Sequence, residues 1–413
     1  MLYSLEEVCL EVTNKCLSNC LHCSSSANRR GLPNELTLDE IKDLIDQATL
    51  LSVSPLPGSA KNLSLDEFTK LIPTLCQKLS EAGNDEEWED AISKEIIQRR
   101  QEAIGKPVLE LSGGEPILHP NIYEIASYGK GKGFKIKLYT AAIAQGGKGI
   151  TADDVEQWSN ILDKDDEVII SVEGATEQTH ERMTAVKGHF RIVMDSIDLF
   201  QRYNINVTAH CTPTKINYKE IPQLVDLLDE KLVRGVAFLR LVPQGRALKN
   251  IDKLMLTKEE FVDLQTIITE EWKAGEQHPE RVVKVRWGCP IDFRHLLYPV
   301  DKKPCHGGRD TIVVRPNGSF HPCPAWKEIK EMSLGNLRSE SLGHIWLDSE
   351  VLNLFRSFTP NDLQGECCWC ASKTICGGGC PAQRILVNLK RGITNKRALL
   401  AVGPDPLCFK ELV

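Results

Sequence analysis

Three cysteines near the N-terminus are the residues whose spacing most clearly implies chemistry. In TNKCLSNCLHCSSS, residues 13–26, Cys16, Cys20 and Cys23 have the spacing C-x3-C-x2-C with no fourth cysteine. A zinc site usually takes four ligands, and a disulfide framework needs an even number of thiols in a short secreted chain. An iron–sulfur cluster can be held by three thiolates, which leaves one iron free for another ligand. The triplet alone leaves all three possibilities open.

Composition narrows these possibilities. The chain has 413 residues, a formal charge of −7 and fifteen cysteines. The negative charge argues against binding of nucleic acid by bulk electrostatics. No apolar run approaches the roughly 20 residues of a membrane-spanning helix, and the N-terminus MLYSLEEVCLEV lacks the features of a signal peptide. A cytoplasmic location is expected, where an odd number of cysteines points to metal binding rather than to disulfides.

A second set of thiols lies in the last third of the chain. Cys305 and Cys323 flank TIVVRPNG, which predicts a hairpin turning at Pro-Asn-Gly. In the stretch CCWCASKTICGGGC, the thiols Cys367, Cys370, Cys376 and Cys380 have the spacing C-x2-C-x5-C-x3-C, and Cys408 follows later in the chain. The glycines at 377–379 suit a backbone wrapped tightly around an inorganic cluster. These thiols favour two iron–sulfur clusters over zinc.

Between the two sets, strand-like and helix-like segments alternate. Apolar, β-rich runs occur at 8–12, 107–113, 134–140, 167–174, 205–211 and 235–242. Segments with helical spacing separate them, and the first helix begins with a capping box formed by Thr37 and Glu40. This order predicts a parallel α/β architecture, a complete or partial β/α barrel. Such a barrel places its chemistry at the carboxyl ends of the strands, where the triplet follows the first strand.

The alternation also suggests domain boundaries. We expect a barrel over 1–242, a bridging region over 243–288 and a cluster-binding domain over 289–413. Residues 52–106 interrupt the barrel where a short loop is expected. We interpret them as a helical insertion packed on the barrel, and a docking surface for substrate or partner is the alternative. Cys76, within the insertion, is predicted to be a buried small hydrophobe.

A family resemblance follows from these motifs together with Gly113-Gly114-Glu115-Pro116 after the second strand. In this order, over residues 8–408, they resemble the radical S-adenosylmethionine (radical SAM) superfamily and its SPASM subgroup. The resemblance implies a partial (β/α)6 TIM-like barrel with a C-terminal SPASM domain, and three 4Fe–4S clusters. S-adenosylmethionine would chelate the open iron of the first cluster, and reductive cleavage would release a 5′-deoxyadenosyl radical that abstracts hydrogen from the substrate.

The resemblance also implies contacts to S-adenosylmethionine. Gly113, Gly114, Glu115 and Pro116 would lie beside the methionine ammonium. The other predicted contacts are Ser171, Thr140, Val242 and His22. In ISVEGATEQTHERM, Arg182 would pair with the methionine carboxylate in two-point geometry, and Glu173 replaces the usual aspartate. His22 stands where the family usually has an aromatic residue near the adenine, Val242 would meet adenine through its backbone, and Thr140 is a weaker candidate.

The auxiliary clusters are assigned by the same resemblance. The outer cluster would be held by Cys367, Cys370, Cys376 and Cys408, and the inner cluster by Cys305, Cys323 and Cys380. Cys289, in RWGCPID, is predicted to be the fourth ligand of the inner cluster. If Cys289 does not bind, that iron is open to a substrate thiolate. Cys9, Cys211 and Cys368 stay unassigned.

Members of the SPASM subgroup mostly modify ribosomally made peptides, and we expect a carbon–carbon or thioether crosslink. Epimerisation, backbone excision, formylglycine formation in sulfatases and small-molecule oxidation are alternatives. Pro324 replaces the aspartate that follows the second hairpin cysteine in sulfatase-maturing relatives, which weighs against formylglycine. Cys211 and Cys9 are weak catalytic candidates, as donors of hydrogen in an epimerisation. An electron carrier with no substrate is a further alternative, against which the S-adenosylmethionine motifs argue.

The expected partners are a ribosomal precursor peptide and an electron donor such as flavodoxin or ferredoxin. No nucleic acid and no membrane are expected. The chain starts almost on its first strand, so we expect it to lack the N-terminal winged-helix domain that binds leader peptides in many peptide maturases. A separate leader-binding protein, or the insertion at 52–106, would then do that work.

Overall fold

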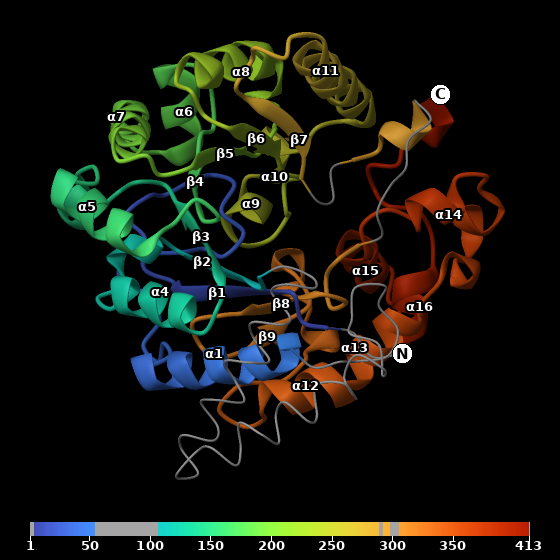
Figure 1. The fold of residues 1–413 in the computed structure, drawn as a ribbon. Coiled ribbons are helices and arrows are strands. Elements are labelled where there is room, and N and C mark those ends of the chain that lie inside the picture. Colours follow the sequence, from blue (N-terminus) through green and yellow to red (C-terminus); the bar gives the residue numbers. More distant parts are fainter. Residues whose placement is uncertain (1–3, 54–105, 289–291, 298–304, 413) are drawn as a thin grey trace, which may run out of the picture.

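The predicted barrel is present as one nine-stranded sheet in the order β7-β6-β5-β4-β3-β2-β1-β8-β9 (Figure 1). The computed structural model describes residues 4–53, 106–288, 292–297 and 305–412. The barrel strands are β1 (Glu7–Thr13), β2 (Val108–Gly113), β3 (Lys135–Thr140), β4 (Glu167–Ser171), β5 (Val207–Cys211), β6 (Gly235–Phe238) and β7 (Lys284–Trp287). Each pairs in parallel with its neighbour. The six predicted strands are confirmed, and β7 extends the sheet beyond them.

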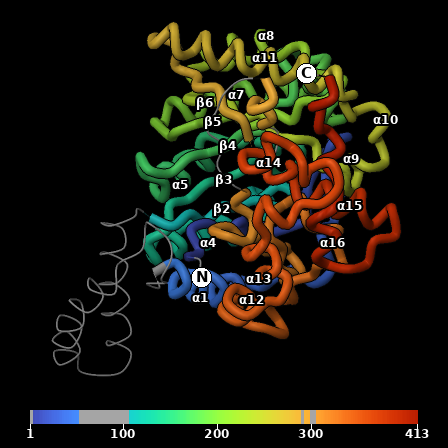
Figure 2. The backbone as a smooth tube through the Cα atoms, turned by 90° about the vertical axis from the view of Figure 1, so that its right-hand side faces the viewer, coloured from blue at the N-terminus to red at the C-terminus, as the bar shows by residue number. Residues whose placement is uncertain are grey.

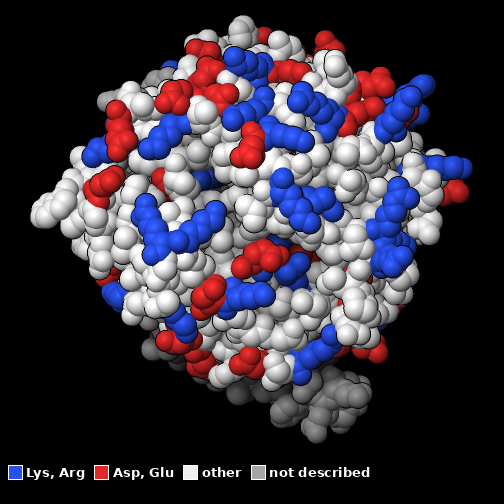
Figure 3. Space-filling view, turned by 180° about the vertical axis from the view of Figure 1, so that it is seen from behind, with Lys and Arg blue, Asp and Glu red and all other residues white. Residues whose placement is uncertain are grey.

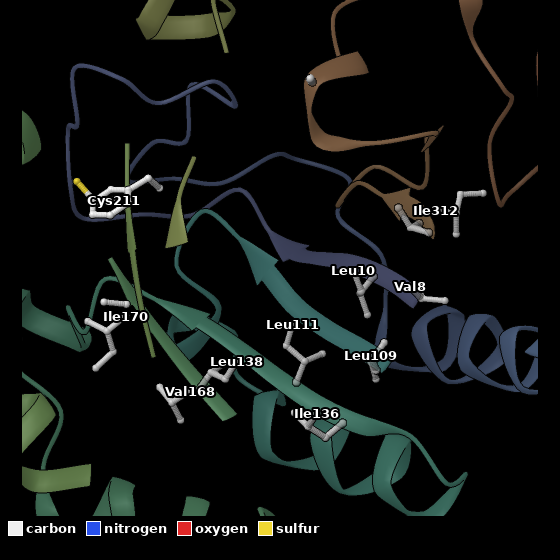
Figure 4. Close-up of a cluster of buried hydrophobic side chains, with 14 of the residues drawn as sticks. Val8, Leu10, Leu109, Leu111, Ile136, Leu138, Val168, Ile170, Cys211 and Ile312 are labelled. Carbon is white, nitrogen blue, oxygen red and sulfur yellow. The ribbon is translucent and has the colours of Figure 1, made fainter. Parts of the chain in front are cut away.

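Alternation along the strands gives the sheet two different faces. In β1, Val8, Leu10 and Val12 are buried in the core, and the intervening residues Cys9 and Glu11 line an internal cavity. Figure 4 shows Val8 and Leu10 on the same side as the apolar residues of the next strands, toward the helices. Because successive side chains of a strand point to opposite faces, one strand serves both the packed exterior and the polar lumen.

Helices cover the outer face of the sheet (Figure 1). They are α1 (Leu38–Val53), α4 (Ile122–Gly131), α5 (Ala152–Ile161), α6 (Glu177–Thr184), α7 (His189–Arg202), α8 (Ile221–Glu230) and α11 (Lys258–Gln277). The predicted capping box is confirmed: the Glu40 amide donates to Thr37 Oγ1 (3.2 Å) and the Thr37 amide to Glu40 Oε2 (2.8 Å). Among the described residues, no helix has the length and apolarity needed to cross a membrane.

The C-terminal region begins with the predicted hairpin, β8 (Thr311–Val314) and β9 (Phe320–His321), which is antiparallel. β8 also pairs in parallel with β1, so the hairpin extends the barrel sheet. This pairing joins residues some three hundred positions apart, which leaves no local sequence signal. Helices follow as α12 (Leu342–Asp348), α13 (Glu350–Ser357), α14 (Lys373–Cys376), α15 (Pro381–Lys390) and α16 (Lys396–Ala401). Figure 2 shows α12 and α13 beside α1.

Two buried ion pairs join the barrel to the C-terminal region. Arg240, just after β6, makes two hydrogen bonds to Asp405 (2.6 and 2.7 Å). Lys327 pairs with Glu11 of β1. All four side chains are nearly inaccessible to solvent. On the molecular surface, by contrast, acidic and basic side chains are interspersed over the face seen in Figure 3.

Several predictions lie outside this description. Most of the insertion at 52–106, with Cys76, and the thiol of Cys289 fall outside the described residues. The boundaries at 242/243 and 288/289 stay predictions. The region 243–288 contributes α11 and β7, and through β7 it pairs with the barrel sheet.

The Arg240–Asp405 pair yields a stability prediction. Asp405→Asn leaves the buried Arg240 charge without its carboxylate, so we expect the free energy of unfolding to fall by about 3–5 kcal/mol. Urea unfolding of the metal-free protein, followed by tryptophan fluorescence, measures this. Arg397→Gln, which breaks the exposed Arg397–Asp362 pair, is the control and should cost less than about 1 kcal/mol. Equal effects of the two substitutions would contradict the prediction.

Candidate functional site

One cavity of about 790 Å³ lies between the lumen face of the barrel and the C-terminal region. Seven cysteines line it: Cys9 of β1, Cys16, Cys20 and Cys23 of the triplet, and Cys305, Cys323 and Cys380 of the C-terminal region. Of the predicted contacts to S-adenosylmethionine, Gly113, Gly114, Thr140, Ser171, Val242 and His22 line the same cavity. The structure therefore brings together two sets of thiols that are almost 300 residues apart in the chain.

Electrostatic contacts sort the thiols into three groups. Burial is the largest cause that raises the pKa of six of these thiols, to about 11 for Cys16 and about 12 for Cys380; the other four are Cys20, Cys323, Cys367 and Cys408. The thiols that interact electrostatically with one another are Cys16, Cys20 and Cys23; Cys305, Cys323 and Cys380; and Cys367, Cys370, Cys376 and Cys408. These are the three sets that the family resemblance implies.

Each group of thiols has the chemistry of an iron–sulfur ligand set. Within the described ranges, no three His, Cys, Asp or Glu side chains converge closely enough to hold one metal ion. A 4Fe–4S cluster takes one thiolate on each of its irons, and each group supplies three or four thiols. Thiols with raised pKa values bind metal with release of protons, so cluster assembly at these sites would be favoured by higher pH.

Two glycines begin the glycine loop, residues 113–116, at the end of β2, and they permit a close contact between chain segments. A Cβ on Gly113, whose φ is +135°, would lie 2.3 Å from the carbonyl oxygen of Thr13. A Cβ on Gly114 would lie 2.4 Å from the carbonyl oxygen of Lys15. The family resemblance implies that these glycines contact S-adenosylmethionine. The structure shows that they also let the end of β2 lie against the end of β1 and the start of the cysteine loop, residues 14–27.

Glu115 is engaged within the protein. Its carboxylate accepts hydrogen bonds from the Thr140 hydroxyl (2.6 Å) and from the Ala141 amide (2.8 Å). It is fully buried and is not among the residues that line the cavity. Burial raises the pKa of this carboxyl to about 7, although the hydrogen bonds oppose the shift. Glu115 thus ties the end of β3 to the glycine loop, and Pro116 begins a short 3-10 helix beside it. Contact of Glu115 or Pro116 with a methionine ammonium stays a prediction.

His22 and Glu173, the two departures from the family pattern, contact each other. His22 Nε2 lies 3.1 Å from Glu173 Oε1, and the Thr212 amide donates to Glu173 Oε2 (3.0 Å). Burial alone would raise the pKa of Glu173, but His22 and the hydrogen bonds outweigh it and hold that pKa below its usual value. His22 therefore fastens the cysteine loop to the end of β4. In the sequence, the signal for this pair is that a histidine at position 22 and a glutamate at position 173 both replace the usual family residues.

Arg246 is a site residue that the sequence analysis missed. Its side chain donates hydrogen bonds to the carbonyl oxygens of Cys20 (3.0 Å) and Ala27 (2.5 Å), and its amide donates to that of Cys23 (2.9 Å). It lies in the short helix α9 (Gly245–Lys249), and a Cβ on Gly245 would come within 2.5 Å of the Ser24 carbonyl oxygen. The segment after β6 therefore holds residues 20–27 of the cysteine loop, whereas the glycine loop contacts its first residues.

Three other predicted residues lie in different surroundings. Arg182 is exposed on α6 and does not line the cavity, so the structure does not bring it to the other predicted contacts. Cys211 is buried, accepts a hydrogen bond from the Asn217 side chain (3.6 Å) and also lies away from the cavity lining. Cys9 is buried but lines the cavity.

Two family models match parts of this sequence, and curated proteins resemble most of it. The model of the radical SAM superfamily matches residues 68–228, and the SPASM model, an iron–sulfur cluster-binding domain, matches residues 305–371. The chain is 25% identical over 376 residues to an AdoMet-dependent heme synthase of Methanosarcina barkeri, covering 89% of each. It is 26% identical over 360 residues to a PqqA peptide cyclase of Rhizobium meliloti, covering 84% of this chain and 86% of the relative.

Solved structures share the fold. Streptococcus suis SuiB bound to S-adenosylmethionine has a TM-score of 0.66 at 16% identity, covering 98% of this chain and 78% of that one. Native anSMEcpe with bound AdoMet has a TM-score of 0.62 at 15% identity, covering 98% and 94%. At these identities the likeness concerns the fold alone.

Gly113→Ala tests the contact between the glycine loop and the cysteine loop. The added methyl group would meet backbone atoms of Thr13 in a conformation that alanine rarely adopts, so we expect loss of about four iron per chain, the content of one 4Fe–4S cluster. Iron analysis after anaerobic reconstitution measures this. Gly131→Ala, where a Cβ would meet nothing within 4 Å, is the control. A Gly113→Ala protein with the iron content of the parent would show that the contact is dispensable.

Arg182→Gln tests the predicted carboxylate contact. Because Arg182 is exposed and outside the cavity lining, we expect the dissociation constant for S-adenosylmethionine to stay within about twofold of the parent value. Equilibrium dialysis of the reconstituted protein measures it. A loss of tenfold or more, about 1.4 kcal/mol, would instead support the pairing with the methionine carboxylate.

Proposed function

Because the chain belongs to the radical SAM superfamily and carries a SPASM domain, we propose that it modifies a ribosomally made peptide, forming a carbon–carbon or thioether crosslink. The proposed cofactors are three 4Fe–4S clusters and S-adenosylmethionine. When bound, they would supply an electron, a 5′-deoxyadenosyl radical that removes hydrogen, and an acceptor for the electron left on the product. The site of action would be cytoplasmic.

The shared cavity carries this proposal. The triplet and the thiols Cys305, Cys323 and Cys380 line one space of about 790 Å³, a size suited to a peptide side chain together with S-adenosylmethionine. A substrate that reacts beside the triplet also faces the inner thiols. An electron carrier without a substrate would have no need for such an enclosed volume.

The polar side chains that line the cavity favour a peptide as the substrate. Glu7, Glu11 and Glu110 line the cavity, and the Tyr139 hydroxyl donates to Glu110 Oε1 (2.6 Å). Of the cations that line the cavity, Lys327 is already paired with Glu11. Glu7 and Glu110 in turn lie near Lys137 (3.3 and 3.5 Å), so what these side chains offer a substrate is acceptor oxygens rather than a large net charge. Acceptor oxygens suit peptide N–H groups and basic side chains.

Modification of a porphyrin is the second candidate, since relatives similar over most of the chain include AdoMet-dependent heme synthases. Porphyrin substrates carry propionate groups, which need free cations in the lumen. The peptide reading is supported by the PqqA peptide cyclases among the relatives and by a fold neighbour described as SuiB bound to the precursor peptide SuiA.

The proposal also assigns roles to Cys289 and Cys9, and it names alternative reactions and partners. Cys289 would complete the inner cluster, and without it an open iron would favour thioether chemistry. Cys9, which lines the cavity, would serve an epimerisation if that alternative holds. Backbone excision, formylglycine formation and small-molecule oxidation are further alternatives. The proposed partners are a precursor peptide, a flavodoxin- or ferredoxin-like electron donor and a separate leader-binding protein.

Anaerobic reconstitution tests the proposal. We expect about twelve iron per chain and formation of 5′-deoxyadenosine with dithionite and S-adenosylmethionine. Changing Cys16, Cys20 and Cys23 together to Ala should remove about four iron and abolish 5′-deoxyadenosine.

Mass spectrometry then compares a short peptide encoded beside the gene with iron coproporphyrin as substrates. A mass loss of two hydrogens in the peptide supports the crosslink. Turnover of the porphyrin alone would replace the peptide proposal by the second candidate, and no 5′-deoxyadenosine from the parent would contradict both.

A further inference from the structure

Arg384 is a buried cation whose contacts with the described residues, a hydrogen bond to a backbone carbonyl and the Phe358 ring 5.7 Å from its Cζ atom, include no carboxylate of its own. It lies in the first turn of α15, four residues after Cys380, and is 1% exposed. Its Nη1 donates a hydrogen bond to the carbonyl oxygen of Gly377 (3.0 Å). Its Nε atom is buried and has no hydrogen-bond partner among the described residues.

The guanidinium of Arg384 lies between the two C-terminal groups of thiols. It is close enough to Cys367 and Cys376, of the outer group, and to Cys380, of the inner group, to interact with all three electrostatically. One side chain thus faces both groups.

The backbone is shaped to admit this side chain. Gly377, Gly378 and Gly379 have φ values of +60°, +79° and +79°, and a Cβ on Gly378 would lie 1.7 Å from Arg384 Nη1. A Cβ on Gly379 would lie 2.4 Å from Asp405 Cβ. The three glycines therefore make room for a buried cation and a buried carboxylate.

The charges around Arg384 do not balance. Asp405 interacts with Arg384, but its two oxygens already accept hydrogen bonds from Arg240, from the Cys380 amide (2.8 Å) and from the Leu407 amide (2.9 Å). One carboxylate thus serves two buried guanidinium groups. Arginine does not lose its proton in proteins, and burying an uncompensated charge is costly. The site is built for additional negative charge.

We propose that Arg384 is a shared positive charge for the two auxiliary clusters, which balances their thiolate ligands and stabilises their reduced forms. A cluster held by four thiolates is anionic and gains a further negative charge when it takes up an electron. A nearby buried cation raises the reduction potential of such a cluster, since charge and hydrogen bonding around the ligands set that potential. The inference rests on the proposed assignment of the two auxiliary clusters, and Arg384 is a positioning residue that does not touch the substrate.

The test is a redox titration of reconstituted protein, with dithionite as the electron source and electron paramagnetic resonance as the readout. Arg384→Gln removes the positive charge, and Arg384→Lys keeps the charge but lacks the planar guanidinium group. Lys390→Gln removes one exposed charge from the last turn of the same helix and is the matched control. We expect the auxiliary signals of Arg384→Gln to appear at more negative potentials. Arg384→Lys and Lys390→Gln should titrate like the parent, and the signal of the triplet cluster should not move in any variant.

The outcomes separate this inference from the proposed function. Full iron content with unmoved auxiliary potentials in Arg384→Gln would overturn the role of Arg384. Loss of iron from both Arg384→Gln and Arg384→Lys would also overturn it, because the guanidinium shape and not its charge would then be needed. Loss of iron from Arg384→Gln alone, with Arg384→Lys like the parent, supports the role of the charge. Only about four iron in the parent chain would refute the auxiliary clusters themselves.

Discussion

One buried carboxylate, that of Asp405, holds together the parts from which the cavity is made. It accepts two hydrogen bonds from Arg240 at the end of the barrel and one from the Cys380 amide. It also lies three residues before Cys408, at the end of the described chain. Because the contact is nearly inaccessible to water, its geometry is enforced by the cost of leaving either charge unpaired. It therefore fixes Cys380 relative to the barrel, while the β1–β8 pairing and the Lys327–Glu11 pair hold the hairpin that Cys305 and Cys323 flank.

The cysteine loop is held from several sides by contacts of different kinds. The glycine loop after β2 lies against its first residues, with no room for a Cβ on Gly113 or Gly114. Arg246 donates hydrogen bonds to its carbonyl oxygens, and His22 pairs with Glu173 at the end of β4. A loop of three closely spaced thiols has little regular structure of its own, so its shape is imposed by the strands around it. This pre-organisation suits a site that must present three thiolates to one cluster.

Polar residues inside the barrel mark where a substrate would lie. The outer side chains of β1 pack in the core, whereas Cys9 and Glu11 face the cavity. Burying so many titratable groups without a ligand is unfavourable unless they are paired, and several are: Glu11 with Lys327, and Glu110 with Tyr139. The lumen is therefore a prepared polar surface, and its acceptor oxygens are the feature on which the preference for a peptide substrate rests.

The sequence alone determined the strands, the cap of the first helix and the hairpin, and the family resemblance implied the three sets of cysteines. The strands, the cap and the hairpin depend on residues close together in the chain: alternation in β1, the Thr37–Glu40 box, the Pro-Asn-Gly turn. It also pointed to the residues of the glycine loop, although not to what they contact. Only the tertiary structure decided that β8 pairs with β1, that Arg246 and Arg384 belong to the sites, and that Arg182 is exposed away from the cavity. The reason is physical. Hydrogen bonds and charges between residues hundreds of positions apart leave no periodic pattern, so their partners become known only when the chain is folded.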